Sequence, residues 1–150
     1  MEISIGSDHA GFQLKESLKE LLESFQHTVF DEGTSAEEST DYPDFAARVA
    51  QSVSEGRVQR GILICGTGIG MSIVANKFPG VRAALCHSLE TARMSRQHND
   101  SNVLTLGSRL LSRDLASTIA TEWLKTHFDG GRHQRRVDKI LAIEGGKWRA

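Results

Sequence analysis

Short apolar runs alternate with longer segments of helical periodicity along this chain, and this alternation restricts its fold more than any other feature of the sequence. Each run is short, apolar and bounded by Gly, Asp, Asn or Ser, as buried β-strands are. We predict strands at Glu2–Gly6, Thr28–Asp31, Gly61–Cys65, Val81–Cys86 and Val103–Leu106.

Between these runs, apolar residues recur at three- and four-residue steps, which is the spacing of helices with one buried face. Pro43 is suited to the first turn of one such helix. The predicted helices cover residues 12–25, 43–53, 71–76, 112–127 and 132–144. A strand–helix–strand order of this kind predicts parallel strands joined by right-handed crossovers. We therefore expect an α/β fold, a three-layer αβα sandwich around a Rossmann-like five-stranded parallel sheet.

The 150 residues carry no internal repeat, low-complexity segment or linker, so we expect a single domain over residues 1–150. The first residues lack the basic and apolar regions of a signal peptide, and no stretch approaches the ~20 apolar residues of a membrane span. Two cysteines are too few for a disulfide framework, which predicts a cytoplasmic protein. A net charge of −1 gives no reason to expect nucleic acid as a partner.

Open parallel sheets bind ligands beyond the carboxyl ends of their strands, near the point where the strand order reverses. Three unusual segments are expected at such positions, namely residues 7–11, 65–70 and 96–100. In the second segment, Cys65 follows a strand and glycines occupy positions 66, 68 and 70. Without side chains there, backbone N–H groups can approach an anion closely. Such a loop by itself equally suits a tight strand-to-helix turn.

The presence of Cys65 favours a catalytic role for this loop. A thiol at a helix N-terminus is favoured as the thiolate, which can remove a proton while neighbouring N–H groups stabilise the resulting oxyanion. Cys86 occupies a comparable strand end without the glycines, so we interpret it as a buried, unreactive thiol.

Several other polar residues are compatible with a structural and a functional role. Asp8 and His9 suit either a helix cap or the binding of sugar hydroxyls. His98 belongs to a polar cluster that leads into a strand, and its type alone is unspecific. Arg132 and Arg136 lie four residues apart on one helix face, where they suit either a bound phosphate or a solvated basic surface.

In combination, these segments resemble one family of sugar-phosphate isomerases, which contains ribose-5-phosphate isomerase B, allose-6-phosphate isomerase and the subunits of galactose-6-phosphate isomerase. The matching stretches run from residue 7 to 136, nearly the whole chain, and are highly specific as a set. They are SDHAGF (7–12), TDYP (40–43), GILICGTGIG (61–70), ANK (75–77), SRQHND (95–100), GSR (107–109) and GGRHQ (130–134).

The resemblance implies a role for individual residues. Cys65 would be the base that moves a proton between C1 and C2, His98 would open the furanose ring, and Thr67 would lie close to that step. The enediolate oxygens would be held by the backbone of Gly66, Thr67, Gly68, Ile69 and Gly70. Sugar oxygens would be bound by Asp8, His9 and Asn99, and the phosphate by Arg109, Arg132 and Arg136.

One branch of the family lacks the cysteine and uses a glutamate four residues further along the chain. Ile69 occupies that position here and cannot act as a base, so the chain resembles the cysteine branch. Members assemble their sites at a dimer interface, which implies a homodimer or a higher homo-oligomer. We expect Arg109 and His98 to face the Cys65 of the other chain.

The implied reaction interconverts D-ribose 5-phosphate and D-ribulose 5-phosphate without a cofactor. The six histidines contain no pair at a metal-ligand spacing such as H-E-x-x-H, so we predict no metal. Two alternatives stay open. In the first, the substrate is a six-carbon sugar phosphate, either allose 6-phosphate or galactose 6-phosphate. In the second, the chain is a nucleotide-binding module without catalysis.

Overall fold

A fully parallel five-stranded sheet forms the centre of the molecule, in a computed structural model that describes residues 1–147. The strand order is β2-β1-β3-β5-β4. The strands are β1 (Glu2–Ser7), β2 (Thr28–Asp31), β3 (Arg60–Cys65), β4 (Ala83–Leu85) and β5 (Val103–Gly107). All five predicted strands are therefore confirmed, with β4 shorter than expected.

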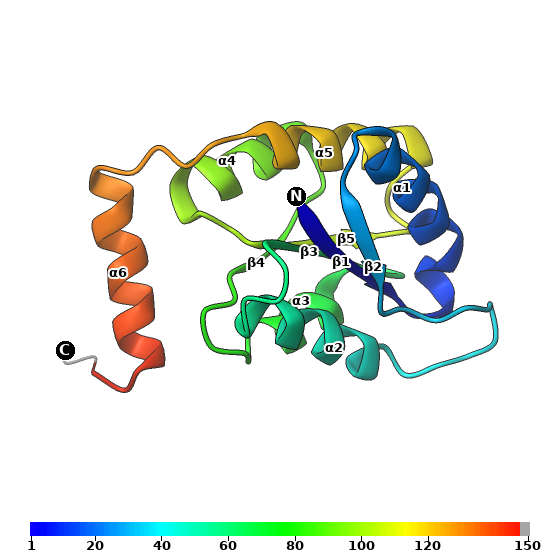
Figure 1. Cartoon of the computed structure of the whole chain (residues 1–150), viewed down its shortest axis with the longest axis horizontal. Coiled ribbons are helices and arrows are strands. Elements are labelled where there is room, and N and C mark those ends of the chain that lie inside the picture. The colour runs from blue at the N-terminus through cyan, green and yellow to red at the C-terminus, as the bar shows by residue number, and fades with distance from the viewer. Residues whose placement is uncertain (148–150) are drawn as a thin grey trace.

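Within residues 1–147, six α-helices and one short 3₁₀ helix, η1 (His9–Gly11), connect and flank the strands. The α-helices are α1 (Phe12–Ser24), α2 (Tyr42–Ser54), α3 (Ile69–Ala75), α4 (Leu89–Asn99), α5 (Arg113–Lys125) and α6 (Arg132–Glu144). Helices α1, α4 and α5 cover one face of the sheet, and α2 and α3 cover the other (Figure 1). The predicted αβα sandwich is confirmed.

Each face of the sheet has its own core, because successive side chains of a strand point to opposite sides. Ile62 and Ile64 of β3 are buried against the layer of α1, α4 and α5. Leu63 and Cys65, the residues between and after them, are buried against α2 and α3. The alternation therefore directs Cys65 toward the layer that contains α3.

The strand order reverses between β1 and β3, because β2 lies on one side of β1 and all later strands lie on the other. The carboxyl ends of these two neighbours meet at one edge of the sheet, where the N–H of Asp8 donates to the carbonyl of Ile64 over 3.3 Å. Asp8 and Cys65 are therefore both located at the position where open α/β sheets bind ligands.

Helix α4 was absent from the sequence prediction, which placed residues 96–100 directly after a strand. The helix begins with a capping box, in which Ser88 and Thr91 each bond to the other's backbone N–H. Its residues are mostly polar, and Ala92 is the only apolar residue among its fully buried ones in the described structure. Because so few apolar positions mark its inner face, hydrophobic periodicity did not reveal it.

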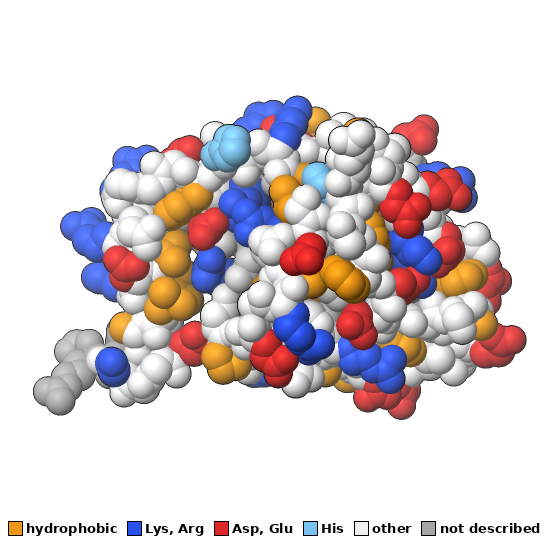
Figure 2. Space-filling view, viewed as in Figure 1, with side chains coloured by type: hydrophobic (Ala, Val, Ile, Leu, Met, Phe, Trp, Pro, Cys, Tyr) orange, Lys and Arg blue, Asp and Glu red, His pale blue; other side chains and the backbone are white. Residues whose placement is uncertain are grey.

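Helix α6 lies apart from the three layers, beside the β4 edge of the sheet (Figure 1). His133 and Val137 are its buried residues, whereas Ile140, Leu141 and Ile143 are exposed. Hydrophobic side chains of α6 border a hollow between this helix and the rest of the chain (Figure 2), a cleft of about 650 Å³. None of the helices in residues 1–147 has the length and apolar character needed to cross a membrane.

Candidate active site

The thiol of Cys65 lies at the end of β3, at the start of the glycine loop. Its Sγ accepts a hydrogen bond from the backbone N–H of Gly68 over 3.1 Å. The side chain is only 5% exposed, yet it lines a surface cleft. The sulfur therefore lies at the start of the loop with one backbone N–H directed at it and with access to the cleft.

The glycine loop has a conformation and a packing that other residues would disturb. Gly68 has φ +77°, in the left-handed region, and a Cβ there would lie 2.9 Å from the carbonyl carbon of Leu106. A Cβ on Gly70 would lie 2.6 Å from ring atoms of Tyr42. The N–H groups of the first turn of α3, which include Gly70 and Met71, have no acceptor within that helix. They can therefore bind an oxyanion next to the thiol.

Asp8 lies directly after β1, where its side chain caps η1 and also borders the cleft of Cys65. Its Oδ1 accepts a hydrogen bond from the N–H of Gly11 over 3.1 Å and thereby caps η1. The structural role is therefore confirmed. The same side chain, 6% exposed, also lines the cleft of Cys65.

His9 is oriented by the segment that precedes α2. Its Nδ1 accepts a hydrogen bond from the N–H of Thr40 over 3.1 Å, and its own N–H donates to Thr40 Oγ1 over 3.3 Å. The neutral imidazole therefore carries its proton on Nε2, which is free to donate to a ligand.

The cleft around Cys65 has a volume of about 440 Å³ and is lined by side chains from four parts of the chain. Thr67, Ile69 and Gly70 come from the loop and Asp8 follows β1, while Tyr42 begins α2 and Arg109 follows β5. The side chain of Arg109 lines the same cleft as Cys65 of its own chain, and a Cβ on Gly66 would lie 3.3 Å from it. Its position relative to the Cys65 of a second chain stays a prediction.

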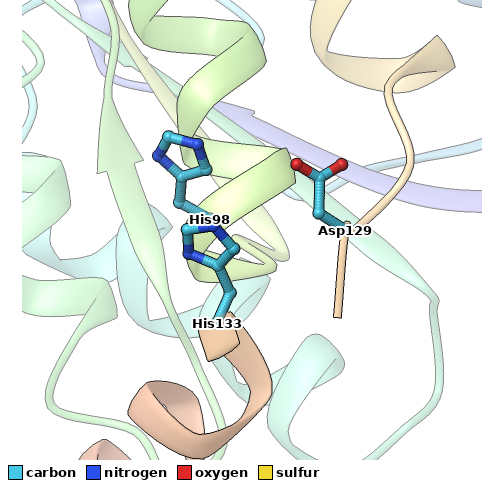
Figure 3. A group of neighbouring side chains, drawn as sticks. All are labelled: His98, Asp129 and His133. Carbon is cyan, nitrogen blue, oxygen red and sulfur yellow. The ribbon is translucent and has the colours of Figure 1, made fainter. Parts of the chain in front are cut away.

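A second group of polar side chains forms where α4 ends and α6 begins. The rings of His98 and His133 stack, with centroids 4.3 Å apart and planes 3° apart (Figure 3). Asp129 extends from the segment before α6 toward the two rings (Figure 3). Its backbone N–H donates to the carbonyl of Gln97 in α4 over 3.1 Å, which ties that segment to the helix that carries His98.

These three side chains are of types that bind metals, and their ligand atoms lie within 4.8 Å of one another. Three features oppose a cation. Burial lowers the pKa of His133, and His98, Arg132 and Arg136 lower it further against the opposing charge of Asp129, so two arginines add positive charge next to the cluster. Arg132 Nε donates to His133 Nε2 over 3.5 Å. The lone pairs of parallel rings do not converge on one point, because they lie in the ring planes.

The cluster of His98, Asp129 and His133 lies near the amino ends of the strands, whereas the cleft of Cys65 lies at their carboxyl ends. Gly61 pairs with Val103 at the start of β5, whereas Cys65 pairs with Gly107 at its end. The length of β5, roughly 13 Å, separates these two pairs. His98 and Asn99 precede β5, so they lie near its amino end. Among the residues that the structure describes, one chain therefore does not bring His98, Asn99, Arg132 or Arg136 into the cleft of Cys65.

Sequence reasoning proposed no role for three residues that the structure places at these sites: Tyr42, Asp129 and His133. Tyr42 had a signal, because it precedes Pro43 in a stretch that matches the family. His133 had the same kind of signal, because it lies in the matching stretch GGRHQ (130–134), whereas Asp129 had none. No spacing rule links His133 to His98, which it meets through the packing of α6 on α4.

The sequence of this chain is similar to those of known sugar-phosphate isomerases. A family model described as Ribose/Galactose Isomerase matches residues 3–140. Ribose-5-phosphate isomerase B of Escherichia coli is 50% identical over 143 residues, which cover 95% of this chain and 96% of that protein.

Two solved structures show the same fold over nearly their whole length. The Clostridium thermocellum ribose-5-phosphate isomerase B superposes with a TM-score of 0.96 at 52% identity, covering 99% of this chain and 100% of that one. The Mycoplasma genitalium ribose-5-phosphate isomerase B, with bound ribulose-5-phosphate, gives a TM-score of 0.93 at 46% identity and covers 96% of each chain. The chain belongs to the ribose/galactose isomerase family.

Proposed function

We propose that this chain is an aldose–ketose isomerase that interconverts D-ribose 5-phosphate and D-ribulose 5-phosphate through a cis-enediolate. The observation that carries the proposal is the thiol of Cys65, held by the Gly68 N–H in a cleft at the switch point of the sheet. Relatives named for this reaction, at about half identity over nearly the full length, support the choice of substrate.

The chemistry needs a thiolate, an oxyanion site and a group that opens the sugar ring. His98 transfers the proton of the O1 hydroxyl to the ring oxygen, which breaks the C1–O4 bond and forms the aldehyde, with Thr67 close to this step. The Cys65 thiolate then takes the C2 proton, and the electron pair moves through C1 onto O1. The N–H groups of the glycine loop stabilise that oxygen. The O2 proton then passes to O1, the C2=O2 carbonyl forms as C1 takes back the proton held by the Cys65 thiol, and the ketose results with Cys65 again a thiolate.

The remaining residues of the site bind substrate without reacting. Asp8, His9 and Asn99 are assigned to the sugar oxygens, and the three arginines 109, 132 and 136 to the phosphate. The arginines contribute by positioning, since guanidinium pairs orient a phosphate in two directions at once. No step in this scheme uses a metal or an organic cofactor.

The active unit is proposed to be a homodimer. The groups that the reaction needs lie at opposite edges of the sheet, so a second copy would supply His98, Asn99, Arg132 and Arg136 to the cleft of Cys65. The exposed Ile140, Leu141 and Ile143 of α6 support this arrangement, because an apolar helix face is normally covered. We further propose the cytoplasm and the non-oxidative branch of the pentose phosphate pathway as the setting, in line with two free thiols.

Incubation of the protein with ribose 5-phosphate in deuterated water tests the proposal. An isomerase with an enediolate incorporates deuterium at C2, which NMR detects as the loss of the C2 proton signal. A nucleotide-binding module without catalysis would leave that signal unchanged. The ratio of kcat/KM for ribose 5-phosphate to that for allose 6-phosphate then distinguishes the five-carbon substrate from the six-carbon alternative.

A further inference from the structure

The end of α4 is formed by an aspartate in an uncommon backbone conformation. Asp100 has φ 47° and ψ 46°, the left-handed region, and follows His98 and Asn99 directly. Its N–H donates to the carbonyl of Arg96, and the N–H of Ser101 donates to the carbonyl of Ser95. This pattern closes a helix in the way that glycine usually does. An aspartate tolerates the conformation less readily than glycine, so a cap alone does not explain its side chain.

The carboxylate of Asp100 lies between two arginines from different elements. Arg96 Nη1 donates to Oδ1 over 2.8 Å, and Arg82 Nη2 donates to Oδ2 over 3.0 Å. The side chains of Arg96 and Arg82 are 4% and 17% exposed, whereas that of Asp100 is 33% exposed, so both ion pairs are partly accessible to solvent at the carboxylate. We call Arg82, Arg96 and Asp100 the Asp100 clamp.

The same arginines also hold the backbone around His98 and Asn99. Arg82 Nε donates to the carbonyl of Asn99 over 3.1 Å and to that of Asp100 over 3.0 Å. Arg96 Nη1 donates to the carbonyl of Ser101 over 2.6 Å. The clamp therefore joins the last turn of α4 to the residue that precedes β4 and to the start of β5.

A buried hydrogen-bond chain fixes the clamp to the core. The Ser101 hydroxyl donates to Ser95 Oγ over 2.9 Å, and Trp123 Nε1 donates to Ser101 Oγ over 2.8 Å. Trp123 is fully buried in the core that α1, α4 and α5 share with the sheet. The end of α4 is therefore rigidly related to the sheet, although His98 and Asn99 themselves are partly or fully exposed.

We infer that Asp100 is a positioning residue for ring opening, whose carboxylate holds the turn that carries His98 and Asn99. The inference rests on the proposed function, because it assigns to Asp100 the placement of the group that opens the ring. Neither arginine of the clamp needs to contact substrate for this role. The charge of Asp100, rather than its backbone conformation, is what the role requires.

Asp100→Asn tests the charge, because asparagine keeps the shape and also tolerates the left-handed conformation. Asp100→Gly tests the backbone, because glycine is the usual residue at this position. Each variant is assayed on ribose 5-phosphate and on 4-deoxyribose 5-phosphate, which cannot close a furanose ring. A displaced His98 should lower kcat/KM on ribose 5-phosphate about tenfold to a hundredfold, and on the open analogue by less than about threefold.

Glu122→Gln is the matched control. Glu122 in α5 is likewise a carboxylate between two cations, with Arg93 Nε of α4 at 2.7 Å and Lys125 Nζ at 2.8 Å. Arg93 lies five residues before His98 in α4, more than one helical turn away. Loss of its ion pair should therefore leave the ratio of the two substrates' kcat/KM unchanged. His98→Asn provides the reference pattern for lost ring opening.

A direct readout separates the clamp from the proposed function. The imidazole proton–nitrogen resonances of His98 should shift in Asp100→Asn and stay in place in Glu122→Gln. The inference is overturned if Asp100→Gly keeps wild-type kinetics, if Asp100→Asn slows both substrates equally, or if the His98 resonances do not move. A wild-type chain without isomerase activity would instead refute the proposed function, and the His98 resonances would still decide whether the clamp positions that residue.

Discussion

The Sγ atom of Cys65 accepts a hydrogen bond from the backbone N–H of Gly68 across 3.1 Å. The other thiol of the chain has a different environment, since burial raises the pKa of Cys86 despite its hydrogen bond with Ser95. Low concentrations of iodoacetamide at neutral pH should therefore alkylate Cys65 first, with activity lost in step. Mass spectrometry of the labelled peptides, with and without ribose 5-phosphate as a protecting ligand, measures this order.

Alanine variants of the two thiols extend that test. Cys65→Ala should keep the fold and abolish C2 exchange, because Ile69 offers no carboxylate as a replacement base. Cys86→Ala should keep most of the activity and lose stability only through packing. An active Cys65→Ala protein would remove the proposed base and the mechanism with it.

Gly70 and Tyr42 should be energetically coupled. A Cβ on Gly70 would lie 2.6 Å from two ring atoms of Tyr42, so Gly70→Ala must displace either the tyrosine or the loop. We expect a marked loss of kcat/KM in Gly70→Ala and a partial recovery in the double variant with Tyr42→Ala. The coupling measured by the double-mutant cycle should be about 0.5–3 kcal/mol.

Gly145→Ala is the control for that experiment. Its φ is −75°, and the nearest atom to an added Cβ is 3.5 Å away, so the change should leave both activity and stability unaltered. Strict additivity of the Gly70 and Tyr42 substitutions would show that their contact does not shape the cleft.

Mixed dimers test whether two chains share each site. Cys65→Ala and His98→Asn should each be severely impaired, yet unfolding and refolding them together should restore activity. Random pairing in a twofold dimer leaves one intact site in half of the dimers, so about a quarter of the wild-type activity is expected. Recovery of no activity from the mixture, with dimers verified by sedimentation, would contradict a shared site.

Exhaustive chelation should leave the isomerase rate unchanged. Cys65 and the loop N–H groups provide the base and the oxyanion site without a Lewis acid, and positive charges surround the His98 and His133 pair. The measurement is the rate before and after dialysis against EDTA, with the metal content verified by mass spectrometry. A loss of turnover that a divalent ion restores would overturn the enediolate scheme.

Asp31 should make stability depend on pH in the acid range. Burial raises the pKa of Asp31, but hydrogen bonds from Lys15 and Lys19 outweigh that effect and hold the pKa below its usual value. The contribution is present above the unfolded-state pKa of about 3.9 and is lost as pH falls through the lower folded-state value. The free energy of unfolding of the wild type, measured with urea, should therefore fall below about pH 4.

Asp31→Asn should flatten that acid dependence. Lys15 is 1% exposed and keeps only Glu16 as an ion partner, so the free energy of unfolding near pH 7 should fall by up to about 3 kcal/mol. If the free energy of unfolding of Asp31→Asn falls as steeply with decreasing pH as that of the wild type, other carboxylates cause the acid dependence.

The sheet and most helices followed from the sequence because their residues carry strong periodic signals. The pattern around Pro43 marked α2, and the extent of α6 was predicted to the residue. Helix α4 was missed because its buried side is formed partly by Ser95 and Arg96, which do not read as an inner face. That omission had a larger consequence, since it placed His98 and Asn99 at the wrong edge of the sheet.

The residues of the site were identified from local motifs, whereas their grouping required the fold. Local sequence placed Cys65, Asp8 and the glycine loop together, because each follows a strand. It did not anticipate that Arg109 approaches the glycine loop of its own chain, where the N–H of Arg109 donates to the carbonyl of Gly66. No spacing rule could pair His98 with His133, because their stacking depends on how α6 packs.

The hydrogen bond from Gly11 to Asp8 also limits how the substrate preference of this cleft can be redesigned. One carboxylate oxygen already accepts the Gly11 N–H, which is shared with the backbone carbonyl of Asp8. A replacement chosen only for a new sugar would lose this side-chain cap, at a typical cost of about 0.5–2 kcal/mol of stability. Only Asn, Ser and Thr combine the capping function with a polar group for the cleft. Most other members of a library built at position 8 therefore combine any change of preference with a loss of stability, whereas Tyr42 and Ile73 line the same cleft and are not tied to this cap.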